Sequence, residues 1–533
     1  MSKMKSSMFI VLLFLSVAVA YGQQQYAKGY VYCDRNGNGK HDRGEEYLPG
    51  VGVTNGSEIV LTDRKGYYKL PVDGEATIAV IKPAQYRTAL GKYNIPASYY
   101  YHKPAGTPRR ENYAGIAPTG KLPASIDFGL IPQEEPEAFT VLLMGDPQPH
   151  FPDHIGYFSK AIVSELENIE GVSFGISLGD VNDENFDLFE PYNREIGKIG
   201  IPWYNLMGNH DMDYEARTDM ESDDAFETFV GPANYAFNYG NAHFLVLDDV
   251  LFPDPRSTGN SRSYWGGFRE DQKAFIKNDL SLVDKDKLVV VAFHIPMLGD
   301  NAVRQEDKAF LFQCLKDFPH VLLLSAHLHR QNQFFHTSQD GWEGKTPLHE
   351  FNAGATCGDF YSGYLDGNGV PLSLMSDGTP KGYAFLRVED NRYSIDYKVA
   401  GRPADYKMSV NIPRKVVRGR HTPAHITVNF FMGSEKDTVV YRIDGGPWKA
   451  MKKEDVTDPD HDYMVQCWNR DDAVKYARWP DASYPSSHIW RVRVPSALPV
   501  GMHAVEVKVT DMFGKTHYGK GEYEVVEAVR MYP

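Results

Sequence analysis

Short apolar runs that end at a polar residue recur along the middle of the chain. They have the length of strands, and amphipathic segments at residues 155–170 and 271–282 lie between several of them. The runs cover residues 139–144, 172–178, 201–206, 243–247, 288–293 and 321–325. Because strands alternate with helices, the pattern predicts an α/β fold with buried, largely parallel strands.

Each run stops at residues that bind metals or move protons. In chain order these are Asp146 and Gln148, Asp180, Asn209-His210-Asp211, Asp248-Asp249, His294, and His327 with His329. An isolated Asn-His-Asp also suits an ordinary turn. Polar groups beside a core are costly unless something there needs them, and open α/β sheets place their sites at the carboxyl ends of strands. The recurrence therefore favours a metal site.

These residues form a motif series that resembles the calcineurin-like metallophosphoesterases. The series is Asp146-x-Gln148, Gly179-Asp180, Gly208-Asn209-His210-Asp211, His294 and His327-x-His329. The resemblance implies a two-sheet α/β sandwich that holds two divalent metal ions. Carried over by position, one ion is bound by Asp146, Gln148, Asp180 and His329, and the other by Asp180, Asn209, His294 and His327.

The donor types suit this arrangement. One carboxylate, Asp180, can bridge two ions, and imidazoles with oxygen ligands suit Mn, Zn, Fe or Ni. Two such ions can clamp the attacking and leaving oxygens of a displacement at phosphorus. The resemblance implies that a metal-bridging hydroxide attacks, while His210 stabilises the phosphoryl group or protonates the leaving oxygen. Asp211 would orient the His210 imidazole.

Two departures from the family pattern affect the metal prediction. Gln148 stands where the family usually has histidine, and Ala326 where it has glycine, so the metal identity stays open. Asp183 stands where the purple acid phosphatase branch has a tyrosine, so a tyrosinate-bound ferric ion is not expected. His150, with a surface role as its alternative, and Asp183 are candidate substrate contacts.

A serine-hydrolase motif also occurs, as Gly175-x-Ser177-x-Gly179. A nucleophile elbow places its serine on a sharp turn between a strand and a helix. Ser177 lies inside an apolar run instead, so this chemistry is disfavoured.

Short β-type runs separated by turn residues occupy both flanks of the chain. They predict a small β-sandwich over residues 23–134, the phosphoesterase domain over 138–400 and a second β-sandwich over 401–533. The polar, proline-bounded stretch at 131–137 is the expected linker.

Residues 34–45 match the spacing of a 12-residue calcium loop with glycine at its sixth position. The candidate ligands are Asp34, Asn36, Asn38, Asp42 and Glu45. An EF-hand needs flanking helices, whereas a β-type run precedes this segment. Calcium binding and a solvated Asn/Gly turn both remain open.

The N-terminus predicts export. Lys3 and Lys5 precede an apolar run at 8–20 that ends in small residues, which is typical of a signal peptide over residues 1–22. The run is shorter than the ~20 residues that span a bilayer, and no later segment is long and apolar enough. We therefore expect a periplasmic or secreted protein with no membrane span in the mature chain.

Charge and cysteine content argue against a nucleic-acid-binding protein and against a disulfide-stabilised one. The formal net charge is -14, and the chain has no Lys/Arg block interleaved with aromatic residues, so nucleic-acid binding is not expected. The four cysteines are scattered and predict no disulfide framework.

The expected activity is hydrolysis of a phosphate mono- or diester, with a small molecule or a glycan as substrate. The motifs do not decide between the two ester classes, because the same bimetal core serves both. The alternative is a surface or carbohydrate-binding protein with a vestigial metal site, and the complete ligand sets argue against it. No segment predicts an oligomeric state.

Overall fold

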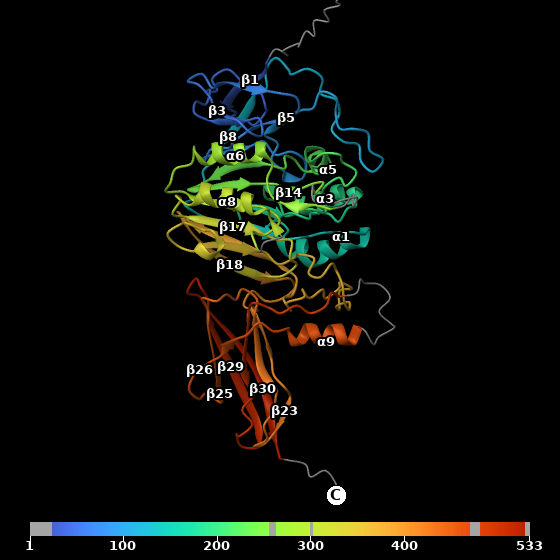
Figure 1. The fold of residues 1–533 in the computed structure, drawn as a ribbon, viewed down its shortest axis with the longest axis vertical. Helices are drawn as coiled ribbons and strands as arrows, with labels where there is room; N and C mark the ends of the chain where they lie inside the picture. Colours follow the sequence, from blue (N-terminus) through green and yellow to red (C-terminus); the bar gives the residue numbers. More distant parts are fainter. Residues whose placement is uncertain (1–23, 255–262, 299–301, 469–479, 528–533) are drawn as a thin grey trace, which may run out of the picture.

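The computed structural model describes residues 24–254, 263–298, 302–468 and 480–527. The predicted signal peptide lies outside these ranges. Three parts follow one another along the long axis of the molecule: an N-terminal β domain, a central α/β domain and a C-terminal β domain (Figure 1). Among the described helices, none combines the length and the hydropathy needed to cross a membrane.

The N-terminal part is a sandwich of two four-stranded sheets with orders β4-β1-β8-β6 and β3-β2-β5-β7. Val31 and Leu70 from one sheet share a core with Val53 and Ile78 from the other. Its strands are β1 (Gln25–Cys33), β2 (Gly52–Thr54), β3 (Ile59–Leu61), β4 (Tyr67–Val72), β5 (Ala76–Val80), β6 (Tyr86–Thr88), β7 (Tyr99–His102) and β8 (Phe128–Pro132).

The central part contains two sheets. The first has the order β11-β10-β9-β20-β21, with β9, β10 and β11 parallel. The second has the order β12-β13-β16-β17-β19-β18, with β13, β16, β17 and β19 parallel. The strands of the first sheet are β9 (Ala138–Met144), β10 (Phe174–Leu178), β11 (Trp203–Leu206), β20 (Gly382–Glu389) and β21 (Arg392–Val399). Those of the second are β12 (Tyr235–Tyr239), β13 (Ala242–Val246), β16 (Leu288–Ala292), β17 (Val321–Ser325), β18 (Asn332–His336) and β19 (Leu348–Asn352), and a separate ribbon pairs β14 (Val250–Leu251) with β15 (Trp265–Gly266).

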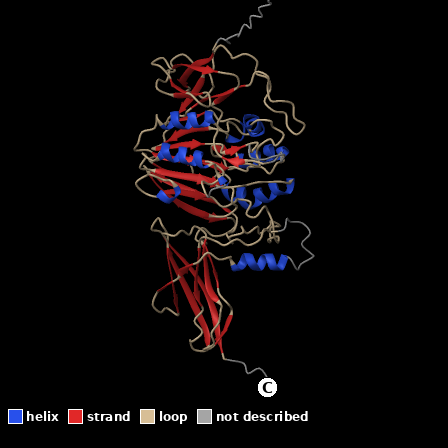
Figure 2. Ribbon diagram, in the orientation of Figure 1, coloured by secondary structure: helices blue, strands red, loops and turns tan. Residues whose placement is uncertain are grey.

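Both faces of the central strands are buried. Val141 and Val290, from different sheets, pack in one hydrophobic cluster. Their neighbours Leu142 and Val291 pack in another, which also contains helix residues. Helices therefore accompany the sheets in the middle part (Figure 2), and the predicted two-sheet α/β sandwich is confirmed. The helices are α1 (Pro152–Phe158), α2 (Ser164–Leu166), α3 (Phe189–Gly197), α4 (Asp219–Ser222), α5 (Asp224–Phe229), α6 (Glu270–Leu280) and α8 (Gln305–Leu315).

The C-terminal part has sheets of order β22-β24-β28-β27 and β23-β30-β29-β25-β26. Its core is continuous with the cluster between the two central sheets. The elements are β22 (Met408–Asn411), β23 (Lys415–Val417), β24 (His425–Phe430), β25 (Thr438–Ile443), β26 (Lys449–Ala450), β27 (Lys452–Lys453), β28 (Ile489–Arg493), β29 (Gly501–Thr510), β30 (Thr516–Val526) and the helix α9 (Pro459–Trp468).

A buried lysine, paired with a carboxylate of the linker, joins the N-terminal sandwich to the central domain. Lys82 Nζ lies 2.7 Å from Glu135 Oε1, and the two side chains are 4% and 0% exposed. Lys82 Nζ also donates to the carbonyl of Asn238 in β12, and Asn238 N donates back to the Lys82 carbonyl. Removing one partner of such a pair costs about 3–5 kcal/mol, because the other charge stays buried. The N-terminal domain is therefore firmly attached to the central one.

Candidate metal centre

The predicted ligands come together where parallel strands of both sheets end. Asp146 follows β9, Asp180 follows β10, His294 follows β16 and His327 follows β17. Parallel strands bring their carboxyl ends to one edge, so ligands far apart in sequence become neighbours.

Five of the predicted ligands have left-handed backbone conformations. The φ angles are 38° for Asp146, 41° for Gln148, 47° for Asp180, 70° for His327 and 49° for His329. Such conformations cost of order 1 kcal/mol each for residues with a Cβ, and they persist where surrounding structure imposes them. The backbone is thus bent to aim these side chains at a common point.

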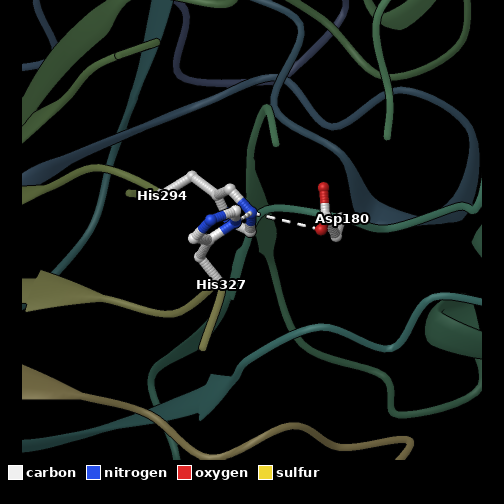
Figure 3. A group of neighbouring side chains, drawn as sticks. All are labelled: Asp180, His294 and His327. Carbon is white, nitrogen blue, oxygen red and sulfur yellow. Dashed lines mark hydrogen bonds and ion pairs between the residues drawn. The ribbon is translucent and has the colours of Figure 1, made fainter. Parts of the chain in front are cut away.

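Asp180, His294 and His327 form the tightest group of possible ligands among the described residues (Figure 3). One ligand atom from each lies within 4.8 Å of the others. His294 Nε2 lies 3.2 Å from both Asp180 Oδ2 and His327 Nδ1. The carboxamide oxygen of Asn209 is buried without a hydrogen-bond partner among the described residues. This is the donor set expected for one ion.

Asp146, His329 and Gln148 supply the remaining donors. Asp146 Oδ1 lies 3.7 Å from His329 Nε2 and 3.9 Å from His294 Nε2. Gln148 donates its amide nitrogen to Asp183 Oδ1 at 3.3 Å, so its oxygen faces the other way. That oxygen is also buried without a partner in the described part of the chain. A bound cation would satisfy it.

Backbone carbonyls fix the orientation of two imidazoles. His294 Nδ1 lies 2.9 Å from the Leu178 carbonyl, and His329 Nδ1 lies 3.2 Å from the Gly358 carbonyl. Since a carbonyl only accepts, both Nδ1 atoms carry the proton. Each Nε2 then faces the carboxylates and is the nitrogen left to bind a metal, as is typical of metal-binding histidines.

The electrostatics of the group favour a cation at its centre. Burial opposes charge on His294, but Asp180 and Asp146 raise its pKa to about 10. Burial lowers the pKa of His327 to about 3 and that of His329 to about 4. Burial also raises the pKa of Asp146 to about 8. Without a metal, His294 and Asp146 therefore each keep a proton at neutral pH while His327 and His329 stay neutral, and metal ions would displace these protons. The residues present fit divalent metal ions.

His210 lies beside this group as a candidate proton donor. Its Nδ1 is 3.0 Å from Asp183 Oδ1 and 3.4 Å from Glu184 Oε1, and its backbone N–H donates to Asp180 Oδ1. Burial disfavours the charged ring, but Asp180, Asp183 and Glu184 raise the pKa of His210 to about 11. The imidazole is therefore protonated at neutral pH.

Family models match successive parts of the chain. The model for the N terminal of calcineurin-like phosphoesterase matches residues 35–115, that for calcineurin-like phosphoesterase matches 139–331, and that for the C terminal of calcineurin-like phosphoesterase matches 350–517. The chain belongs to the calcineurin-like phosphoesterase family. It is a metal-dependent phosphoric ester hydrolase, as the sequence motifs predicted.

Solved structures show only distant similarity to this phosphoesterase. Purple acid phosphatase PPD1 from yellow lupin (Lupinus luteus) seeds is 13% identical, with a TM-score of 0.36. The match covers 66% of this chain and 67% of the phosphatase chain. Vps29 from Chaetomium thermophilum is 13% identical over 49% of this chain and 96% of its own, with a TM-score of 0.21. No curated protein matches the chain.

The predicted role of Asp211 in the phosphoesterase needs correction. Its carboxylate accepts hydrogen bonds from the backbone N–H groups of Gly208, Val181 and Asn182 at 2.8, 3.2 and 3.0 Å. These bonds join the two loops that carry Asp180 and Asn209. Asp183 and Glu184, rather than Asp211, contact the His210 ring. Backbone donors from these two loops occupy the Asp211 oxygens, and the sequence pattern did not reveal this.

The candidate substrate contacts His150 and Asp183 lie on the exposed side of His210. His150 Nδ1 is 3.1 Å from Asp183 Oδ2, and its side chain is 47% exposed. Asp183 therefore contacts His150, His210 and Gln148 together. The Asp183 carboxylate thus holds this rim together through one hydrogen bond, from Gln148, and close contacts with the two imidazoles.

Glu184 and Phe360 support the site but were not predicted, and Asp249 was predicted only as a carboxylate at a strand end. Glu184 is a second carboxylate beside His210. Asp249 accepts the backbone N–H groups of His294 and Ile295 and so fixes the end of β16; its place at the end of an apolar run was the available signal. Phe360 stacks on the His329 ring with centroids 4.1 Å apart. No pattern in the sequence pointed to Phe360.

The candidate calcium loop is paired within itself. The side-chain amides of Asn36 and Asn38 donate to Asp42 Oδ2 at 2.8 and 2.7 Å. Asp34 accepts from the backbone of Asn38 and Gly39, and Glu45 accepts from the backbone of Arg35 and Asp42. These contacts are those of a polar turn, and calcium binding stays a prediction.

Gly208→Ala should disrupt the metal centre without unfolding the protein. A Cβ at this position would lie 2.2 Å from Asp180 Oδ1 and 2.3 Å from Asp180 N, both inflexible neighbours. We expect the variant to lose most of its metal, as measured by elemental analysis after dialysis. Gly156→Ala is the control, because its Cβ meets nothing within 4 Å in helix α1. Equal metal content in the two variants would contradict the described position of Asp180.

Proposed function

We propose that this protein is a secreted phosphoesterase that uses two divalent metal ions to hydrolyse phosphate mono- or diesters. The observation that supports two ions is the pair of buried carboxamide oxygens without partners among the described residues, those of Gln148 and Asn209. One belongs to each predicted ligand set. An unsatisfied buried acceptor costs about 1–3 kcal/mol, so two of them beside one carboxylate cluster favour two cations over one.

The bound ions, Mn, Zn, Fe or Ni, would supply Lewis-acid activation of a water nucleophile and of the phosphoryl oxygens. In Asp180, Oδ2 faces His294 Nε2, and Oδ1 accepts a hydrogen bond from the backbone N–H of His210. Asp180, Asp183 and Glu184 raise the pKa of His210, so the protonated ring can stabilise the phosphoryl group and donate a proton to the leaving oxygen. His150 lies at the exposed rim, where a substrate would enter.

The first experiment compares two chromogenic esters, para-nitrophenyl phosphate and bis-para-nitrophenyl phosphate. Apo-protein is reloaded separately with Mn, Zn, Fe, Ni or Mg and assayed with each ester. We expect turnover of at least one ester with one of the transition metals, and the preferred ester assigns the subclass. Binding of two ions per chain without any turnover would support the alternative, a surface or carbohydrate-binding protein with a vestigial site.

Two substitutions separate metal binding from proton donation. Asp180→Asn should lower the content of both ions together, because one carboxylate serves both ligand sets. His210→Ala should retain both ions and reduce kcat by roughly 10²–10⁴-fold, the usual contribution of a general acid. The exposed Asp187→Asn is the matched control for charge. Full metal content and activity in Asp180→Asn would refute the shared-ligand assignment.

Secretion is supported by the signal-peptide pattern of residues 1–22. We expect protein from a cell expressing the full chain to be found in the periplasm or medium. Its intact mass should correspond to cleavage near Ala20 to Gly22. An uncleaved chain that stays in the cytoplasm would contradict the proposed location.

A further inference from the structure

A long loop of the N-terminal domain reaches the catalytic domain. Residues 103–127 connect β7 to β8, and this light-blue segment of Figure 1 runs from the N-terminal sandwich down beside α5. Arg110 and Tyr113 lie in this loop. Both contact Asp213, three residues after His210 in the chain.

The contacts of the loop converge on the buried carboxylate of Asp213. Its side chain is 1% exposed and forms an ion pair with Arg110 Nε. The hydroxyl of Tyr113 donates to the same oxygen, Asp213 Oδ2, at 3.0 Å. The other oxygen, Oδ1, accepts the backbone N–H of Glu215. Arg110 also lies 3.6 Å from Glu221 through Nη2.

Tyr113 also contacts the second loop of the active site. Tyr113 is 7% exposed and belongs to the hydrophobic core of the catalytic domain. It packs edge-on against Phe186, with centroids 5.3 Å apart. Phe186 follows the segment that carries Asp180, Asp183 and Glu184. One side chain from another domain therefore touches the elements that carry both His210 and its carboxylate partners.

The remaining contacts of the His210 loop come from the catalytic domain itself. Asp211 holds the backbone of Gly208 and Val181, and the Tyr214 hydroxyl donates to the Asn209 carbonyl. These contacts, together with the bonds from the His210 N–H to Asp180 Oδ1 and from the Glu184 N–H to the His210 carbonyl, fix the backbone of the loop from Asn209 to Asp211. The described contacts that fix the Asp213 side chain at its end include the pair from the N-terminal domain.

We propose that Arg110 and Tyr113 are positioning residues, which set the His210 imidazole through Asp213 and make the N-terminal domain part of the catalytic unit. The inference rests on the proposed role of His210 as proton donor. A displacement of about 1 Å in a catalytic group can reduce turnover 10²-fold. Loss of these two contacts should therefore impair proton donation more than metal binding.

The test uses the full chain with Arg110→Ala, Tyr113→Phe and Arg109→Ala. Arg109 is the matched control, since it is the neighbouring arginine and is exposed. Each variant is assayed with a para-nitrophenyl ester and with the phenyl ester of the same class. Phenolate is the poorer leaving group and depends more on protonation.

We expect Arg110→Ala to lower kcat for the phenyl ester by roughly 10–100-fold, with a smaller effect on the para-nitrophenyl ester. KM and metal content should stay near wild type. Tyr113→Phe should show the same selectivity more weakly, and Arg110→Lys should restore part of the loss. In a His210→Ala background, Arg110→Ala should have no leaving-group-specific effect.

Equal losses for both esters, loss of metal, or the same losses in Arg109→Ala would overturn the proposal in favour of a general structural role for the loop. The position of His210 gives a readout that does not need turnover. In crystals of metal-loaded Arg110→Ala, the ring should move away from Asp183. An unmoved ring would refute the inference even if the wild type hydrolysed neither ester, an outcome that would count separately against the proposed function.

Discussion

The structure of the active site depends on the concentration of carboxylates and imidazoles at one buried point. Asp146, Asp180 and His294 are 0%, 2% and 0% exposed, and His294 Nε2 lies 3.2 Å from Asp180 Oδ2 and 3.9 Å from Asp146 Oδ1. Buried carboxylates are strongly unfavourable unless positive charge compensates them. The raised pKa values of His294 and Asp146 reflect this cost, because each group keeps a proton at neutral pH, and a pair of metal ions would compensate the carboxylates more completely. The strained backbone at five of the ligands is the conformational consequence of aiming so many donors at one place.

The close packing of ligand-bearing loops explains the glycines in the motifs. Gly179 lies against His294, where a Cβ would be 2.3 Å from Nδ1, and Gly208 lies against Asp180. Neither position leaves room for a side chain. Each glycine permits two ligand-bearing loops to approach closely, so the motif positions before the metal ligands are determined by packing as much as by chemistry.

Both flanking domains support loops of the metal centre. On the N-terminal side, Arg110 and Tyr113 hold Asp213. On the C-terminal side, His488 contacts Asp377 at 3.1 Å, and Asp377 accepts the backbone N–H of Gln331, two residues after His329. Arg330 lies over the ring of Tyr484. Both β-sandwiches therefore pack directly against loops of the catalytic domain. The central and C-terminal parts also share one hydrophobic cluster.

The sequence by itself determined the family, the α/β class of the core and the residues that meet at its strand ends. It could do so because apolar periodicity is local and because each ligand directly follows its strand in the chain. It did not determine the partner of His210: Asp211 is adjacent in sequence, but its oxygens are taken by backbone donors, and Asp183 with Glu184 approach from another loop. The contacts of Phe360, Arg110 and Tyr113 were also hidden, since they join segments tens of residues apart that carry no motif. Only the tertiary structure decides which of several nearby carboxylates reaches an imidazole, because that choice depends on loop geometry and on competition for hydrogen-bond donors.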